Sequence, residues 1–276
     1  MSAVVRQVTG VIRLEWKKTF LSRRGWWVYL LALAPVGINL LHLLFEMRFQ
    51  GIRHRGHSVI QDSQIFAAMF QLYFLHLGIF FGCVGIFSNL FRGEMLEKTL
   101  HYYFLTPMRR ELLVIGKYLS GLMVAVALFV VSAAASFYLI GRHQGVAWSE
   151  FLSHGPGFSQ MGWYMAVTAL GCAGYGAVFL LAGLFIRNPM IPAAVVMVWE
   201  NLNPFLPGFL KKISVIFYLK SLCPLDVPVP PPFSVLVTET DPTPAWLAVP
   251  GLIAVATAML VYAAFSARKA EISYGE

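Results

Sequence analysis

Charged side chains gather in one stretch of this 276-residue chain, Phe91 to Gly121, which reads FRGEMLEKTLHYYFLTPMRRELLVIGKYLSG. The stretch approaches the phosphate-cradling motif G-x-x-x-x-G-K-[ST] but does not complete it. Glu111 stands where the motif needs its first glycine, and Tyr118 stands where it needs Ser or Thr. These residues therefore cannot cradle a nucleotide phosphate by that route, and their charges are better suited to binding a partner.

Histidines and carboxylates elsewhere do not form a catalytic set. His42 lies near the end of one apolar run and His76 about a dozen residues into the next, which separates them by roughly 12 Å in depth at a rise of about 1.5 Å per residue. One haem iron cannot bridge that offset. A membrane-embedded hydrolase or lipid transferase would need paired carboxylates or a metal cluster at one depth, and Glu200 alone supplies neither. A stand-alone channel or scaffold stays open as an alternative.

The composition predicts a membrane protein. Hydrophobic residues make up 58% of the chain and charged residues only 12%, and the mean hydropathy is +0.68, which leaves too little polar surface to cover a soluble globule. A helix needs about 20 apolar residues to cross roughly 30 Å of hydrocarbon. Six runs meet or approach that length: Trp26–Phe45, Ile65–Phe91, Leu112–Ile140, Met161–Ile186, Met190 to about Leu206, and Trp246–Phe265. The predicted fold is a single all-α polytopic domain, residues 1–276, with six transmembrane helices.

The positions of Lys and Arg predict the orientation of these spans. If the N-terminus is inside, seven of the 21 basic residues fall in outer segments, which leaves fourteen in cytoplasmic ones; the seven are Arg48, Arg53, Arg55, Arg142, Lys211, Lys212 and Lys220. This bias favours cytoplasmic N- and C-termini. The net charge of +8 is then a topology signal rather than a nucleic-acid surface.

Two segments outside the spans have patterns of their own. Residues 1–25 place apolar side chains at helical spacing between basic ones, which predicts an amphipathic helix in the cytoplasmic interface, bound to lipid; the stripe is Val5, Val8, Ile12, Trp16 and Phe20. The alternative is a simple positive anchor. Residues 207–245 contain an amphipathic piece followed by PLDVPVPPPF, which predicts an interfacial helix and an extended lid on the outer side.

The charged stretch joins the second and third spans, so this topology places it in the cytoplasm. Met95, Leu96 and Leu100 can share one face of a helix, with the charged residues on the remainder. Thr106 and Pro107 then end this helix and begin the next. A short amphipathic helix joined to two membrane helices is suited to transmitting a displacement from a soluble partner to the membrane helices. The alternative is an ordinary solvated loop.

The stretch resembles the cytoplasmic loop of type-2 ATP-binding-cassette (ABC) exporter permeases. The matching positions are Glu94, Glu97, Thr99, Leu100, Thr106, Pro107, Arg109 or Arg110, Glu111, Gly116 and Lys117. The six-span layout, the N-terminal helix and the long segment before the last span also resemble that family. Two departures are Lys98, where a glycine usually precedes the Thr-Leu pair, and the aromatic HYYF in place of an aliphatic run.

The resemblance implies that residues 92–111 form a coupling helix that docks on a separate ATPase subunit. The implied coupling residues are Glu94, Glu97, Thr99, Leu100, Tyr103 and Pro107. ATP and Mg²⁺ would bind to that partner, with no cofactor on this chain. The resemblance also implies a second permease copy or homologous permease, export, and a bacterial cytoplasmic membrane as the location.

Polar residues inside the spans are the candidates for a translocation path, because they are costly in lipid. Glu200 and Asn201 in the fifth span and Asn39 in the first form the predicted set. For Glu200, the alternative is that the span ends there and the residue lies in the outer headgroups. For Asn39, a hydrogen bond between helices is the favoured alternative. Small residues along the fourth span, such as Gly171, Gly174 and Gly183, predict close packing within the subunit.

Overall fold

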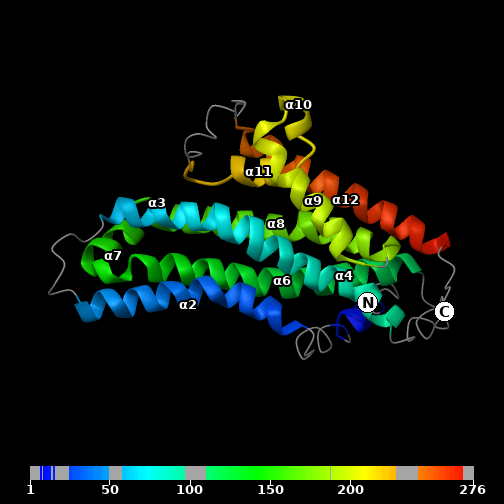
Figure 1. Ribbon diagram of the computed structural model, residues 1–276, viewed down its shortest axis with the longest axis horizontal. Coiled ribbons are helices and arrows are strands. Elements are labelled where there is room, and N and C mark those ends of the chain that lie inside the picture. The colour runs from blue at the N-terminus through cyan, green and yellow to red at the C-terminus, as the bar shows by residue number, and fades with distance from the viewer. Residues whose placement is uncertain are drawn as a thin grey trace.

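The structure is a computed structural model that describes residues 7, 9–13, 15, 25–49, 58–96, 110–186, 188–227 and 242–269. These described residues form helices and turns, with no strand among them. Figure 1 shows an elongated bundle whose long helices run along a common axis. The predicted all-α class is confirmed.

Five long helical stretches build the bundle. They are α2 (Trp26–Phe49), the continuous stretch of α3 (Val59–Met69), π-helix η2 (Phe70–Ile79) and α4 (Phe80–Leu96), then α6 (Arg110–Ile140), α8 (Gly157–Phe185) and α12 (Ala245–Lys269). Shorter elements connect them: η3 (Arg142–Gln144), α7 (Val146–Ser153), α9 (Met190–Leu202), η4 (Asn203–Phe205), α10 (Gly208–Lys211) and α11 (Val215–Ser221).

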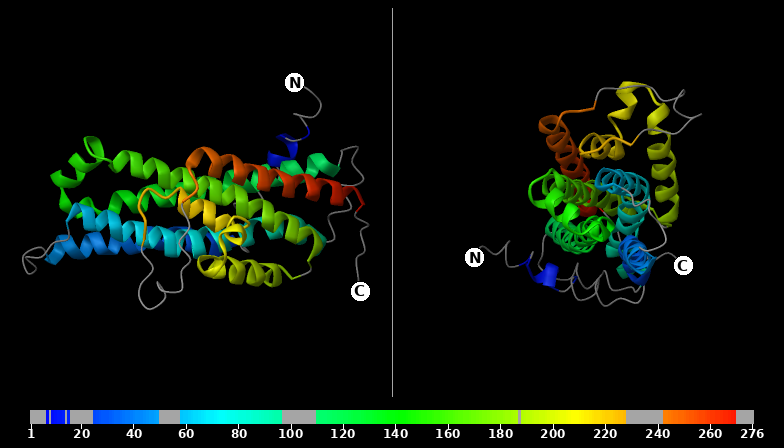
Figure 2. Two further views of the ribbon diagram at one scale, coloured as in Figure 1. Left: turned by 90° about the horizontal axis from the view of Figure 1, so that it is seen from above. Right: turned by 90° about the vertical axis from the view of Figure 1, so that its left-hand side faces the viewer.

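The described residues include five helices long and apolar enough to cross a membrane. They are Trp26–Arg48, Val59–Phe91, Arg110–Gln144, Gly157–Phe185 and Ala245–Arg268, and they overlap five of the six predicted spans. The stretch Val59–Phe91 is the most enclosed, since 78% of its apolar window is buried, against 28% for Trp26–Arg48 and 22% for Ala245–Arg268. In the view along the long axis in Figure 2, α2, α9 and α12 accordingly lie at the periphery.

The prediction of a sixth span at Met190–Leu206 is not confirmed. Helix α9 has 13 residues, about 20 Å at 1.5 Å per residue, which is shorter than the roughly 30 Å of a hydrocarbon core. The helix ends where Pro204 follows Asn203, and Pro207 opens the next turn. The chain then folds back, and α11 packs at Gly171 and Gly174, midway along α8.

The bundle has two distinct ends. At the end that we call the basal end, Arg268 of α12 pairs with Glu111 at the start of α6, and Glu15 pairs with Lys117. The opposite, apical end holds the start of α3, the turn η3 and helix α7 (Figure 1). Helices α2, α6 and α8 extend farther toward the apical end than α12 does (Figure 1).

Glycines on α8 hold neighbouring helices at short distance. A Cβ atom added to Gly183 would lie 3.0 Å from the backbone of Ser88 on α4, and one added to Gly174 would lie 3.1 Å from Val215 of α11. Small residues allow such approaches, which strengthen van der Waals contact between membrane helices. The predicted close packing along the fourth span, within the subunit, is confirmed.

We expect Gly183→Leu to destabilise the protein by about 1–3 kcal/mol, because the new side chain meets the backbone of Ser88 on α4. The thermal midpoint of the detergent-solubilised protein measures the effect. Gly162→Leu is the matched control, since a Cβ at Gly162 on the same helix meets nothing within 4 Å. Equal midpoints for the two variants would contradict the packing described above.

Candidate functional site

The predicted coupling residues lie on and after the end of α4. Glu94 belongs to the last turn of this helix. Glu97, Thr99, Leu100, Tyr103 and Pro107 lie outside the described residues, so their roles stay predictions. The structure does describe both flanks: α4 ends at Leu96, and α6 begins at Arg110. The intervening residues therefore connect two long helices of the bundle.

The start of α6 is tied to the end of α12. The Arg268 guanidinium on α12 forms an ion pair with the Glu111 carboxylate. Arg110 Nη1 also donates to the backbone carbonyl oxygen of Arg268, at 3.1 Å. The pair is partly exposed, so its contribution to stability is small, about 0–1 kcal/mol. Its effect is geometric, because it fixes the last helix next to the flank of the predicted coupling segment.

Asn39 lies between helices rather than in an open path. Its side chain is buried, and Nδ2 donates to the backbone carbonyl oxygen of Ser136 on α6 at 3.3 Å and lies 3.8 Å from the Met69 sulfur on α3. These contacts join three helices. The residue therefore acts as a link between helices, the alternative that the sequence favoured.

Glu200 anchors the beginning of α11. Its carboxylate is 4% exposed and accepts hydrogen bonds from the backbone N–H groups of Val215 and Ile216, each at 3.1 Å, and from the Ser214 hydroxyl. A negative charge at a helix N-terminus satisfies amides that have no partner within the helix. Glu200 thus fastens α11 to α9.

The three predicted path residues do not converge. Asn201 is exposed, and its Nδ2 donates to the carbonyl oxygen of Met197 one turn earlier on α9. Asn39 contacts α3 and α6, whereas Glu200 faces α11. Within the described part of the chain, no group of three His, Cys, Asp or Glu residues could hold a metal ion. The assignment of a translocation path to these residues stays a prediction.

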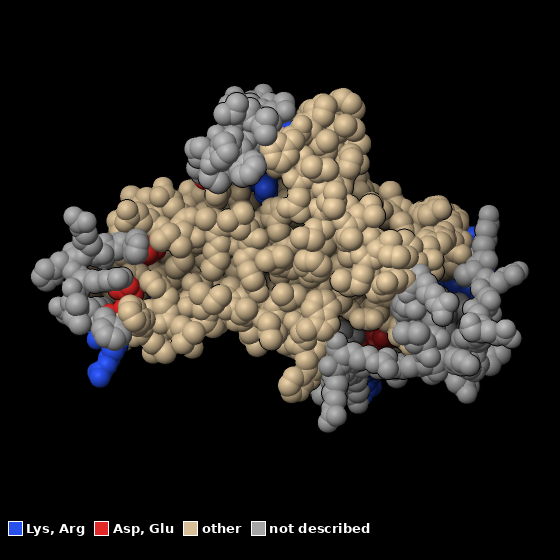
Figure 3. All heavy atoms as spheres, in the orientation of Figure 1, with Lys and Arg blue, Asp and Glu red and all other residues tan. Residues whose placement is uncertain are grey.

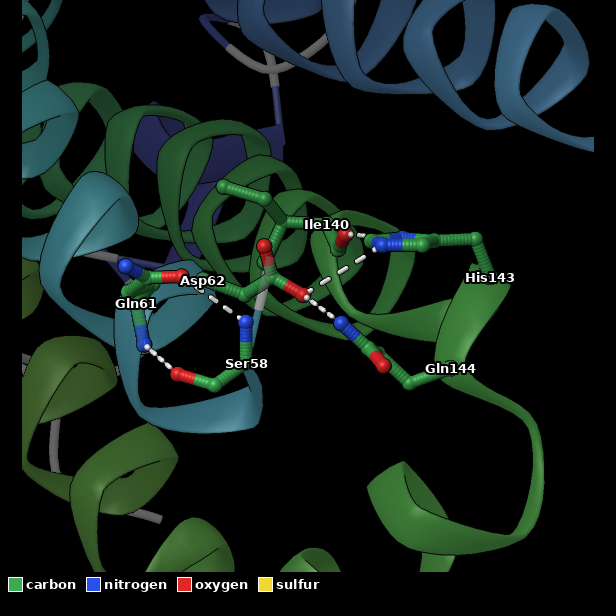
Figure 4. Close-up of polar contacts among 6 residues, drawn as sticks. All are labelled: Ser58, Gln61, Asp62, Ile140, His143 and Gln144. Carbon is green, nitrogen blue, oxygen red and sulfur yellow. Dashed lines mark hydrogen bonds and ion pairs between the residues drawn. The ribbon is translucent and has the colours of Figure 1, made fainter. Parts of the chain in front are cut away.

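A polar cluster at the apical end was missed from the sequence. Asp62 of α3 is 1% exposed; its Oδ2 accepts a hydrogen bond from Gln144 Nε2 at 3.0 Å and lies 3.5 Å from His143 Nε2 (Figure 4). His143 Nδ1 is 3.1 Å from the carbonyl oxygen of Ile140. The cluster fixes the first turn of α3 to the end of α6. The capping box of Ser58 and Gln61, an S-x-x-Q pattern, was the available signal for that helix start.

Charge on the visible surface is concentrated at the ends of the bundle. Figure 3 shows acidic and basic side chains near the apical and basal ends and a small basic patch beside α10 and α11, with a largely uncharged surface over the rest of the bundle. An uncharged belt flanked by charge is the surface that a hydrocarbon layer requires.

Residues 11–203 match a family model described as ABC-2 family transporter protein. The chain belongs to this family. No curated protein matches the chain. The match begins at Val11 and ends at Asn203, so it covers the N-terminal segment from Val11 onward, both flanks of the predicted coupling segment, and α9. Membership makes this chain a multi-pass membrane subunit of an ABC transporter, and it supports an ATPase subunit as the kind of partner with which the permease works.

In this ABC-2 permease, we expect Glu200→Ala to lower the thermal stability by about 1–3 kcal/mol, since buried N–H groups of α11 lose their acceptor. Intrinsic tryptophan fluorescence during heating measures the change. The exposed neighbour Asn201→Ala is the control and should melt like the wild type. A Glu200→Ala protein as stable as this control would show that the carboxylate does not hold α11.

The apical cluster predicts a local effect. Asp62→Ala removes the acceptor of the Gln144 amide and the partner of His143, so the first turn of the permease's α3 should open more often. Hydrogen–deuterium exchange over residues 58–66 should quicken while α12 exchanges as before. Glu150→Ala, at an exposed carboxylate on α7, is the control. Unchanged exchange in the Asp62 variant would refute the assigned contact.

Proposed function

We propose that this chain is the permease of an ABC exporter, which couples ATP hydrolysis by a separate ATPase subunit to movement of a hydrophobic or amphiphilic substrate. The observation that supports it best is the direct continuity of residues 97–109 with α4 and α6. In this proposal, a displacement of the segment by the ATPase is passed to the two helices that flank it. ATP and Mg²⁺ bind to the partner, which supplies the energy.

The basal end is the cytoplasmic end in this proposal. The two-to-one excess of basic residues that the sequence assigns to cytoplasmic segments supports it. Contacts at this end join residues far apart in the chain, Glu15 with Lys117 and Glu111 with Arg268. Both termini are then cytoplasmic, and the push from the ATPase arrives where the two terminal helices are held.

The mechanism requires an element with two arrangements that both the ATPase and the substrate can bias. Two permease copies would each bind one ATPase subunit. Closure of these two ATPase subunits on ATP moves the coupling helix, and α4 and α6 then rearrange the substrate pathway between the two permease copies. Helices α2 and α9 carry exposed apolar faces that suit contact with lipid or with such a second copy. These faces include Leu30, Leu33, Ile38, Leu41, Leu44, Ile191, Val195 and Val198.

Purification of the solubilised permease from its native membrane tests this function. We expect a nucleotide-binding ATPase to co-purify with the wild type and to be lost from a Glu94→Ala, Glu97→Ala double variant, because both residues belong to the proposed docking segment. The control is a Glu46→Ala, Glu150→Ala double variant, which removes the same charge from α2 and from the apical helix α7.

Two results would count against the proposal. If no ATPase accompanies the intact wild-type protein, the permease works without this partner, and a channel or scaffold becomes the better assignment. If the ATPase binds the loop variant and the control equally well, these two carboxylates are not the docking contact.

A further inference from the structure

The N-terminal segment contacts two consecutive residues of α6, Gly116 and Lys117. A Cβ atom added to Gly116 would lie 3.0 Å from the Cβ of Val11. Glycine suits this approach, because a Cβ atom here would require Val11 to move back by a few tenths of an ångström. Val11 itself is 4% exposed, and residues 9–13 are helical. We call Gly116 and Lys117 the N-terminal seat.

Lys117 connects three parts of the chain. Its side chain is fully buried, and Nζ lies 2.5 Å from Glu15 Oε1 and 2.9 Å from the carbonyl oxygen of Leu90 on α4. The ammonium also lies 5.4 Å from the centre of the Phe91 ring. The N-terminal segment, the end of α4 and the start of α6 therefore meet at one ammonium group.

Burial makes the contact between Lys117 and Glu15 hard to give up. The two side chains are 0% and 4% exposed, and a buried charge that loses its partner is strongly disfavoured. Separation of the segment from α6 would leave Lys117 without the carboxylate of Glu15. The segment is thus held by the protein itself, in addition to any attraction from lipid headgroups.

The N-terminal seat also lies between the two helices, α4 and α6, that the proposed coupling motion displaces. Leu90 and Phe91 belong to α4, which leads into residues 97–109, and Lys117 belongs to α6, which follows them. The N-terminal segment in turn precedes α2, which begins at Trp26. A displacement of α4 and α6 at the basal end therefore reaches Glu15, and through it the chain leading to the first span.

We propose that Gly116 and Lys117 are positioning residues that transmit the coupling motion to the N-terminal segment and α2. Docking of the segment follows from the contacts alone, whereas transmission rests on the proposed ABC function. The two parts are therefore tested by separate readouts.

Docking is tested by thiol labelling of Val11→Cys in full-length protein that also carries Cys223→Ser. A maleimide reagent should react slowly with this buried position in the wild-type seat. In Lys117→Met or Glu15→Leu, reaction should quicken by an order of magnitude or more, since each substitution removes one member of the buried ion pair. The Lys117→Met, Glu15→Leu double variant should regain slow labelling, because an apolar pair can replace a buried ion pair.

The matched control is Gly10→Cys, which is exposed and has open space around its Cβ position. It should label equally fast in every background. Slow labelling of Val11→Cys in the single variants would overturn the docking role of the pair. A double variant that labels as fast as the single ones would show that an apolar pair cannot replace the ion pair, and it would overturn the attribution of fast labelling to an uncompensated buried charge.

Transmission is tested in the complex with the co-purified ATPase. Spin labels at Gly10→Cys and Val146→Cys, an exposed position at the apical end, report the distance from the segment to the bundle. ATP with vanadate should shift this distance in the wild-type seat and in the double variant, but not in Lys117→Met. A shift that persists in Lys117→Met overturns transmission. Absence of any co-purified ATPase defeats the proposed function instead, while the labelling result still decides docking.

Discussion

Close contact between helix backbones holds this bundle together. A helix that leaves lipid for another apolar helix gains little from the hydrophobic effect, so van der Waals contact must supply the attraction. Helix α8 shows this constraint, because its glycines admit the backbone of Ser88 on one side and Val215 of α11 on another. The positions of α4 and α11 therefore follow from the shape of α8, and α4 leads in turn to the predicted coupling segment.

Buried charged side chains hold short elements that are too small to be positioned by helix packing along a span. Helix α11 has only seven residues, too few to hold its place by packing along a span, and the Glu200 carboxylate binds its first amides. The N-terminal segment is likewise held at the buried Lys117, and the first turn of α3 at the buried Asp62. In each case a charge in a dry environment has few alternatives to its partner, which makes the attachment specific.

Several parts of the chain that the proposed function involves meet at the basal end. The flanks of residues 97–109, the end of α12 and the N-terminal segment all converge there through Glu111 and Lys117. In the proposed mechanism, the permease transfers displacement from a soluble ATPase subunit to its spans. Convergence at the basal end would distribute that displacement over α4, α6, α12 and the segment before α2, and the N-terminal segment would then belong to the coupling path in addition to any role as a lipid anchor.

The sequence by itself determined that the protein lies in a lipid bilayer, that its fold is all-α, and where its five long helices occur. Apolar run length is a local property, and a lipid core about 30 Å thick selects for it directly. Only the tertiary structure showed that residues 190–206 do not form one continuous helix of the length predicted for a sixth span. Their composition suits a span, but the chain turns after α9, and Glu200 meets amides of α11 that lie 15 and 16 residues later. The partner of Lys117 lies 102 residues away. Such pairings depend on which helix faces meet, and no local pattern encodes that.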